Sequence, residues 1–154
     1  MGGGTPLKKF NFRLEQVRRW RESQRDAEEA RLQALFAELN QLERARVALG
    51  NAAAEADQAV RPGPDAPLPP MQELQALDSY RGYIRRECHR LASLRPPLEA
   101  RIATQRRALT EAERKMAVLD LLREEKLEEW KKELDKEQED LVAELVVARW
   151  ARAC

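Results

Sequence analysis

Residues 98–149, LEARIATQRRALTEAERKMAVLDLLREEKLEEWKKELDKEQEDLVAELVVAR, are the stretch of sequence that decides the fold. Apolar residues recur in it mostly at steps of three, four or seven, which indicates a helix that packs along one side on another helix. Neither glycine nor proline interrupts the stretch, so it predicts one helix about 75 Å long. Such a helix is too long for a globular core, and the rest of the chain is expected to pack along it. The recurring positions are Leu98, Ile102, Leu109, Ala112, Met116, Leu119, Leu127, Trp130, Leu134, Leu141, Leu145 and Ala148.

The composition agrees with a long helical pairing. Of the 154 residues, 36% are charged and 5% are aromatic, and the mean hydropathy is −0.70, which is typical of a coiled coil. The formal net charge of +1 gives no overall argument for a nucleic-acid partner. Two cysteines, no apolar signal-peptide core and no run approaching the roughly 18 apolar residues of a membrane helix favour a cytosolic protein without disulfides.

The remainder of the chain predicts two further helical stretches and a turn. A flexible tail is expected at residues 1–6, and a helix is expected at 8–57, with its apolar stripe at Leu32, Leu35, Leu39, Leu42 and Leu49. Residues 58–70 contain five prolines, which exclude a helix and predict the turn. A return arm follows at 71–95 and 97–150, with a kink or break expected at Pro96-Pro97; a sharp reversal there, giving a three-helix bundle, is the less favoured alternative.

The two arms differ in length, and this difference predicts an overhang. An antiparallel pairing about the turn places Phe10 opposite Met116 or Ala117, so the helix beyond Leu122 has no partner within the chain. Dimerisation, docking into another protein or cover by the N-terminal tail would each explain its apolar stripe. The expected fold is therefore all-α: a long antiparallel two-helix coiled coil, or hairpin, forming a single domain over 1–154 with an overhanging C-terminal helix.

No catalytic constellation is present in the sequence. His89 is the only histidine, which excludes a histidine-based triad or a multi-histidine metal site. Cys88 and His89 are adjacent and point to different sides of a helix, so we expect a packed thiol beside a surface imidazole. No phosphate-binding glycine motif occurs. We expect a protein that is not an enzyme and that binds neither a metal nor a cofactor.

Charges and aromatic residues suggest interaction surfaces instead. A basic stretch covers residues 8–25 and an acidic one covers 120–140; they read either as ordinary solubility or as ends that dock by charge complementarity. Tyr80 and Tyr83 lie near the turn, where they either cap the bundle or form an interaction edge. Three tryptophans lie toward the open end of the hairpin: Trp20, Trp130 and Trp150.

Several segments, taken in order, resemble the FliJ family of flagellar export proteins. The start Phe10-x-Phe12-Arg13-Leu14-x-Gln16-Val17, followed by an arginine- and glutamate-rich helix, is similar to the start of that family. Tyr80-x-x-Tyr83-Ile84 is similar to its Tyr-x-x-Tyr-Leu segment. Ala143 departs from the family, in which an Asp often stands, and so do the two proline-rich sites. The C-terminal arm of the family is matched by Glu113-Arg114-Lys115, Glu137-Gln138, Glu144 and Arg149.

The resemblance implies a stalk-like antiparallel hairpin in the flagellar type III export apparatus, peripheral to the inner membrane without inserting into it. Its implied partners are the hexameric export ATPase, the cytoplasmic domain of the export gate and export chaperones, with weak self-association through the overhang as a further possibility. The residues implied at the ATPase are Phe10, Phe12, Arg13, Val17, Trp20, Trp130, Glu137 and Arg149. Those implied at the gate are Leu39, Leu42, Tyr80, Tyr83 and Ile84.

Three other readings stay open from the sequence. One is the equivalent stalk of a non-flagellar type III secretion system. Another is a generic coiled-coil scaffold or a prefoldin-like chaperone subunit, which would bind clients without stimulating an ATPase. The third is a nucleic-acid-binding hairpin, although glutamates interleaved with the basic residues of the first helix argue against it.

Overall fold

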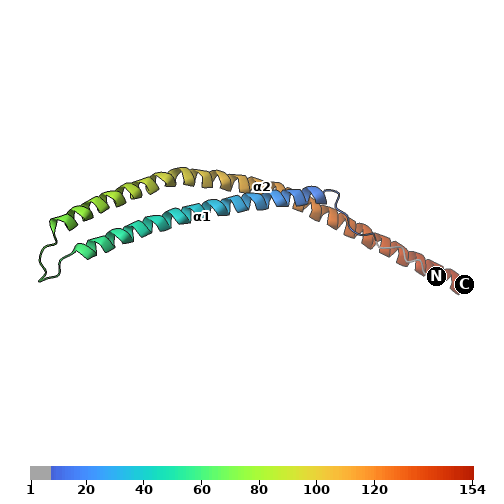
Figure 1. Ribbon diagram of the computed structural model, residues 1–154. Helices are drawn as coiled ribbons and strands as arrows, with labels where there is room; N and C mark the ends of the chain where they lie inside the picture. The colour runs from blue at the N-terminus through green and yellow to red at the C-terminus, as the bar shows by residue number, and fades with distance from the viewer. Residues whose placement is uncertain (1–7) are drawn as a thin grey trace. The chain divides into compact units, whose positions relative to one another are not determined.

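The computed structural model describes residues 8–154, which form two helices: α1, Glu15–Val60, and α2, Met71–Ala153. A non-helical segment, 8–14, precedes α1, and a loop, 61–70, joins the helices (Figure 1). No strand occurs among residues 8–154. The predicted all-α fold with two helices packed against each other is confirmed, whereas coiled-coil supercoiling stays a prediction. The tail predicted at 1–6 lies outside the described residues.

The chain divides into two compact units, and each contains part of both helices. Unit 2 is Ala27–Leu109, and unit 1 combines the chain up to Asp26 with Thr110–Cys154. Within each unit the two segments run antiparallel. In unit 2, Asp57 pairs with Arg81 and Glu38 pairs with Arg101; in unit 1, Arg18 pairs with Asp120 and Phe10 contacts Trp130.

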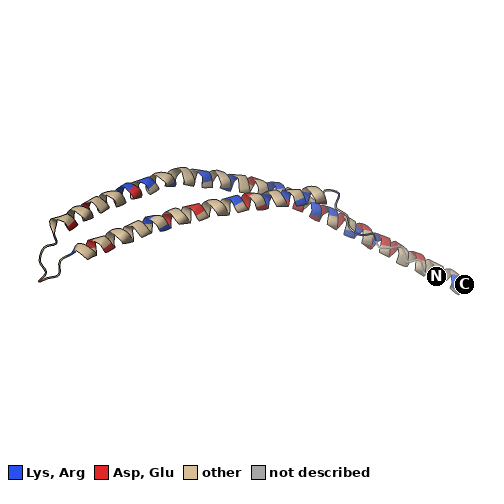
Figure 2. Ribbon diagram, in the orientation of Figure 1, with Lys and Arg blue, Asp and Glu red and all other residues tan. Residues whose placement is uncertain are grey.

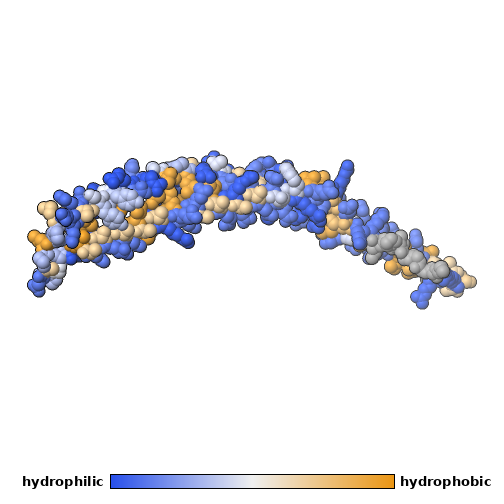
Figure 3. All heavy atoms as spheres, viewed as in Figure 1, coloured by the Kyte–Doolittle hydropathy of each residue, from blue (hydrophilic) through white to orange (hydrophobic). Residues whose placement is uncertain are grey.

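The core of unit 2 lies along the line where α1 faces α2. Leu35, Leu98 and Ile102 are buried together, and Leu32, Phe36 and Leu39 pack against them. Apolar atoms gather along this line in Figure 3. The leucine stripe predicted for the first helix is confirmed, since Leu32, Leu35, Leu39, Leu42 and Leu49 are all buried or half-buried.

The first helix is shorter at its start and longer at its end than predicted. It begins at Glu15 and not at residue 8, because Lys8 and Lys9 would place positive charge at the positive end of the helix dipole, whereas Glu15 complements it. It continues past residue 57 to Val60. Pro62 then restricts Arg61 to extended conformations, and the turn occupies 61–70 instead of 58–70.

The second helix is continuous through Pro96-Pro97, so of the predicted kink or break the break is wrong, and the kink stays a prediction. The two prolines leave the carbonyls of Ala92 and Ser93 without helical donors, but both of those residues are exposed, and water can reach them. Leu91 and Leu98 on either side are 8% and 6% exposed, so buried contacts hold the helix before and after the prolines. Neither the three-helix reversal nor a break is present in α2.

The register of the N-terminal segment also differs from the prediction. Phe10 lies against Trp130, and not opposite Met116 or Ala117. Residues 8–14 are not helical, so they advance along α2 by up to about 3.3 Å per residue, compared with 1.5 Å in a helix. Residues 123–133, which were expected to overhang, therefore line a surface shared with residues 8–14. Among the described residues, every one from Asp135 onward is exposed.

Candidate partner-binding surfaces

A groove of unit 1 lies between the N-terminal segment and α2. It has a volume of about 780 Å³. The rings of Phe10 and Trp130 meet at its wall, with centroids 5.9 Å apart and planes inclined by 57°. Such a tilted pair suits the quadrupoles of the two rings. The groove is lined by Lys8, Lys9, Phe10, Asn11, Phe12, Arg13, Leu14, Leu122, Lys126, Glu129, Trp130 and Glu133.

Phe12 fixes the path of this segment. Its side chain is only 7% exposed, and its carbonyl accepts a hydrogen bond of 3.1 Å from the N–H of Glu15. This bond makes a turn directly before α1, and the burial of the ring anchors that turn. Phe10 on one side and Arg13 on the other are thereby held at the groove.

Ion pairs join the two segments of unit 1 beside the groove. Arg18 Nε donates a hydrogen bond of 2.7 Å to Asp120, and this bond raises the pKa of the Arg18 guanidinium. Arg123 Nε lies 3.5 Å from Glu15 Oε2, and both of these atoms are buried. The Arg123 guanidinium also lies 5.8 Å from the centre of the Phe10 ring, a cation–π contact. The Phe10 ring is therefore held against α2 both by packing on Trp130 and by the charge of Arg123.

The residues implied at the ATPase fall into separate groups within unit 1. Phe10, Arg13 and Trp130 line the groove, as does Phe12, although its burial makes it a packing residue. On α1, Val17 is 43% and Trp20 52% exposed, with the Arg21 guanidinium 4.7 Å from the Trp20 ring. The groove does not include Glu137 or Arg149, which lie on the exposed end of α2.

Unit 2 carries an exposed pair of tyrosines on α2. Tyr80 and Tyr83 are 39% and 48% exposed, and their rings stack with centroids 6.3 Å apart and planes inclined by 22°. Their exposure fits the predicted interaction edge, and the alternative that they cap the bundle stays a prediction. Arg85 and Arg86, which follow in sequence, are exposed and form no ion pair with the described residues. The tyrosines therefore offer apolar rings beside free positive charge.

The other residues implied at the gate do not lie with the tyrosines at an exposed surface. Ile84 is 6% exposed, and Leu39 and Leu42 are half-buried against α2. The neighbours of these leucines, Glu38 and Glu43, pair with Arg101 and Arg95, which lie about 20 to 30 Å along α2 from the tyrosines at 1.5 Å per residue. The five residues therefore do not come together at one exposed surface: Ile84 is buried and Leu39 packs against the core of unit 2, whereas Tyr80 and Tyr83 are exposed.

Polar residues within the helix contact were missed by the sequence reasoning. Arg81, Arg95 and Arg123 are separated by multiples of seven, and so are their partners on α1. The three pairs are Arg81–Asp57 at 2.7 Å, Arg95–Glu43 at 3.6 Å and Arg123–Glu15 at 3.5 Å. An arginine at a seven-residue apolar spacing, with a carboxylate at the matching spacing on the other helix, is the signal that could have found them.

Gln105 adds a further polar contact in unit 2. Its side-chain N–H₂ donates to the backbone carbonyl of Glu28 at 3.0 Å and also to the Glu28 carboxylate. Polar groups at a helix contact fix one register, because any slip would leave them without partners. These polar contacts therefore help to fix the alignment of the two helices in unit 2.

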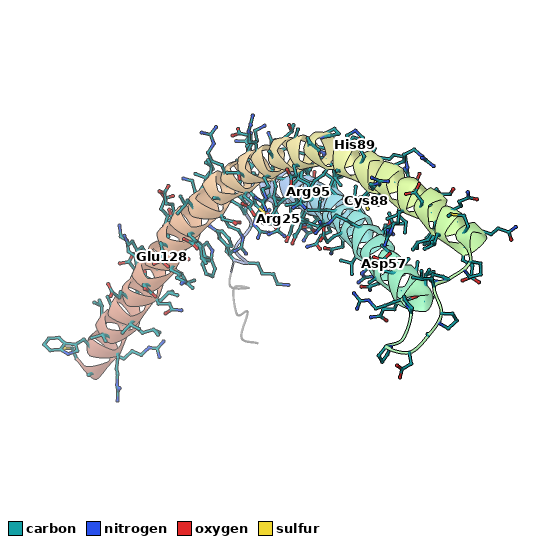
Figure 4. All side chains as sticks on the ribbon, turned by 90° about the vertical axis from the view of Figure 1, so that its left-hand side faces the viewer. Arg25, Asp57, Cys88, His89, Arg95 and Glu128 are labelled. Atoms are coloured by element: carbon teal, nitrogen blue, oxygen red, sulfur yellow. The ribbon has the colours of Figure 1, made fainter. Side chains whose placement is uncertain are left out.

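No metal-ligand cluster is found in residues 8–154: no three or more His, Cys, Asp or Glu side chains are placed to hold a metal ion. Cys88 is half-buried and His89 is exposed on α2, where Figure 4 labels both. Cys88 and Cys154 are free thiols. The described helices also contain no stretch with the length and apolar character needed to cross a membrane.

Comparison of the chain with protein-family models, with curated proteins and with solved structures finds no match.

Proposed function

We propose that the protein is a non-enzymatic, stalk-like component of a type III protein export apparatus, similar to the FliJ family. In this proposal unit 1 binds the export ATPase ring and the tyrosine pair of unit 2 binds the cytoplasmic domain of the export gate. Handling of export chaperones, and a location at the cytoplasmic side of the inner membrane, follow from the same resemblance. The flagellar system is our first choice, and its non-flagellar counterpart would use the chain in the same way.

The observation that carries the proposal is the groove of unit 1. Its lining joins the start Phe10–Leu14, which resembles the FliJ family, with Leu122–Glu133 of α2. The second segment lies between Glu113-Arg114-Lys115 and Glu137-Gln138, which resemble the C-terminal arm of that family. These segments are more than a hundred residues apart in sequence, yet they meet around one aromatic wall. A groove with aromatic rings, an arginine and a charged rim has the composition of a protein-binding hot spot.

The unit 2 surface supports a second, chemically different contact. Tyr80 and Tyr83 are exposed although they are large and partly apolar, and tyrosine is enriched at protein interfaces. The basic residues beside them favour an acidic partner surface. Two surfaces of unlike chemistry suit a protein that binds two different partners.

The test separates these two contacts with matched variants. Purified protein is titrated into the export ATPase of the same organism, and ATP hydrolysis and ring formation are followed. We expect stimulation by the wild type and by Tyr83→Ala, and its loss in Arg13→Ala. Binding to the isolated gate domain should show the reverse pattern.

Both substitutions lie at exposed residues, so helicity measured by circular dichroism should stay at the wild-type level. No stimulation at any ratio by wild-type protein of normal helicity would overturn the proposal and favour a scaffold or chaperone. Equal loss of both activities in both variants would leave the stalk function standing but contradict the assignment of the two surfaces.

A further inference from the structure

The end of α2 carries a large apolar stripe that the described part of the chain does not cover. Leu141 and Leu145 are 58% and 69% exposed, and Val142, Val146 and Trp150 are 60%, 54% and 75% exposed. Each row has a spacing of four, and the rows adjoin because consecutive residues lie about 100° apart on a helix. A stripe of this size on a charged chain marks an interaction surface.

The charges along this segment are divided between its two halves. Its beginning carries four carboxylates and one lysine, whereas its end, after Glu144, carries only arginines. The carboxylates are Asp135, Glu137, Glu139 and Asp140, the lysine is Lys136, and the arginines are Arg149 and Arg152. The first half of the segment is therefore acidic and its end is basic, and the apolar stripe runs along one face of the helix. Figure 2 shows α2 with its acidic and basic residues coloured.

Such a segment is complementary to itself when two copies run in opposite directions. At 100° per residue, Asp135, Glu139, Arg149 and Arg152 lie on the side of the apolar stripe. In an antiparallel pair centred between Glu144 and Leu145, Arg149 comes within one residue of the level of Glu139, and Arg152 comes within two residues of the level of Asp135 and Glu139. In a parallel pair Asp135 and Glu139 would face the same two residues of the other copy, and like charges would oppose each other. The charge distribution therefore favours a second copy of this chain as the partner, and an antiparallel orientation of the two helices.

We propose that residues 135–153 of α2 pair antiparallel with the same residues of a second copy of this chain. The contact is isologous, as in a two-fold dimer, with the leucine and valine rows between the helices and the arginines near the acidic half of the partner. The segment is about 28 Å long at 1.5 Å per residue. Because it continues α2, it needs no separate helix nucleation, and pairing supplies the packing that it lacks in the single chain.

The first test measures the molar mass of the full chain by sedimentation over a range of concentrations. We expect a monomer–dimer equilibrium in the micromolar range and a loss of dimer in Leu145→Asp. Leu121→Asp is the matched control, because Leu121 is also on α2 of unit 1 and is 61% exposed but lies outside the stripe. Wild-type protein that stays monomeric up to millimolar concentration, or equal loss in both variants, would overturn the proposal.

The second test reverses the charges of each half separately. Arg149→Glu with Arg152→Glu makes the segment acidic throughout, and Asp135→Lys with Glu139→Lys makes it basic at both ends. Each doubly substituted chain should self-associate about tenfold more weakly or worse, because exposed pairs are replaced by repulsions. A mixture of the two should form the heterodimer, since the acidic chain then faces the basic one.

Failure of the mixture to associate, while the single variants dimerise like wild type, would contradict the antiparallel pair. Both tests use this chain alone, so they stand or fall independently of ATPase stimulation. The normal helicity of each variant, checked by circular dichroism, excludes unfolding as the reason for a lost dimer.

Discussion

Units 1 and 2 use the same two helices and both have ion pairs between them, but they differ in how much apolar packing holds the helices together. Of the buried hydrophobic residues in the described chain, unit 2 has Leu35, Ile84, Leu91, Leu98 and Ile102, whereas unit 1 has Phe12 and Met116. Where α1 of unit 2 presents leucines to α2, α1 of unit 1 has half-buried arginines, namely Arg18, Arg21 and Arg25. Apolar burial is insensitive to salt, while partly exposed ion pairs are screened by it. We infer that unit 1 is the weaker unit and the one that opens first.

The largest effect is expected from the core of unit 2. Leu98→Ala removes a side chain that is 6% exposed and packs with Leu35 and Ile102. It should lower the free energy of unfolding by about 3 kcal/mol, measured by urea denaturation. Leu94→Ala is the matched control on the same helix, because Leu94 is 45% exposed and should change stability little. Equal effects of both substitutions would show that Leu98 is not a core residue in solution.

A smaller effect is expected from the aromatic wall of unit 1. Phe10→Ala removes the ring that lies against Trp130, and the pair contributes about 1 kcal/mol beyond its buried area. In a chain whose other tryptophans are changed to Phe (Trp20→Phe, Trp150→Phe), the emission of Trp130 should shift to longer wavelength as water reaches it. An unchanged emission spectrum would contradict the contact between the two rings.

The ion pair of unit 1 should contribute less still, and its contribution should depend on salt. A double-mutant cycle with Arg18→Gln and Asp120→Asn should give a coupling energy of about 0.5 kcal/mol at low salt, because the two side chains are 23% and 41% exposed. This energy should fall toward zero in 1 M NaCl, where the Debye length is about 3 Å. A coupling energy that does not change with salt would remove the proposed difference between the units.

The smallest effect concerns the acid sensitivity of unit 2. The hydrogen bond from Arg46 lowers the pKa of the exposed Glu43 carboxyl below its ordinary value of 4.5, and the nearby Arg95 of α2 acts in the same direction. Because the folded pKa is the lower one, this contribution to stability is present above pH 4.5 and is lost as the pH falls through the folded pKa. Glu43→Gln should remove this small pH dependence, measured by thermal unfolding at pH 6 and below pH 4. A variant that keeps the full wild-type dependence would contradict it.

The sequence was sufficient to predict both helices, the proline-rich loop and the leucine stripe, because seven-residue spacing and proline each act locally. It did not predict the register at Phe10, since that depends on residues 8–14 being non-helical, which follows from the lysines at the helix start. Nor did it predict the continuity at Pro96-Pro97. There the freed carbonyls lie on exposed residues while Leu91 and Leu98 stay buried, and this requires knowing which side of α2 faces α1.

The candidate surfaces were predicted in part for the same reason. Phe10 and Trp130 were assigned to one end of the hairpin, and they do meet. Ile84, Leu39 and Leu42 were assigned to a partner although they belong to the helix contact, because a pattern of apolar residues does not distinguish an internal face from a docking face. The arginines at the helix contact were missed because charged residues are read as solvent-exposed unless a partner is sought on the other helix.

Hydrogen exchange of the backbone amides tests the difference between the units most directly. Amides of α1 at residues 19–26 in unit 1 and at 32–42 in unit 2 are compared in low and high NaCl, at one pH. We predict that the unit 1 amides exchange faster, through local opening, and that high salt speeds their exchange more than that of the unit 2 amides. Equal protection of both stretches, with the same response to salt, would contradict the view that unit 1 depends more on charge and unit 2 more on apolar burial.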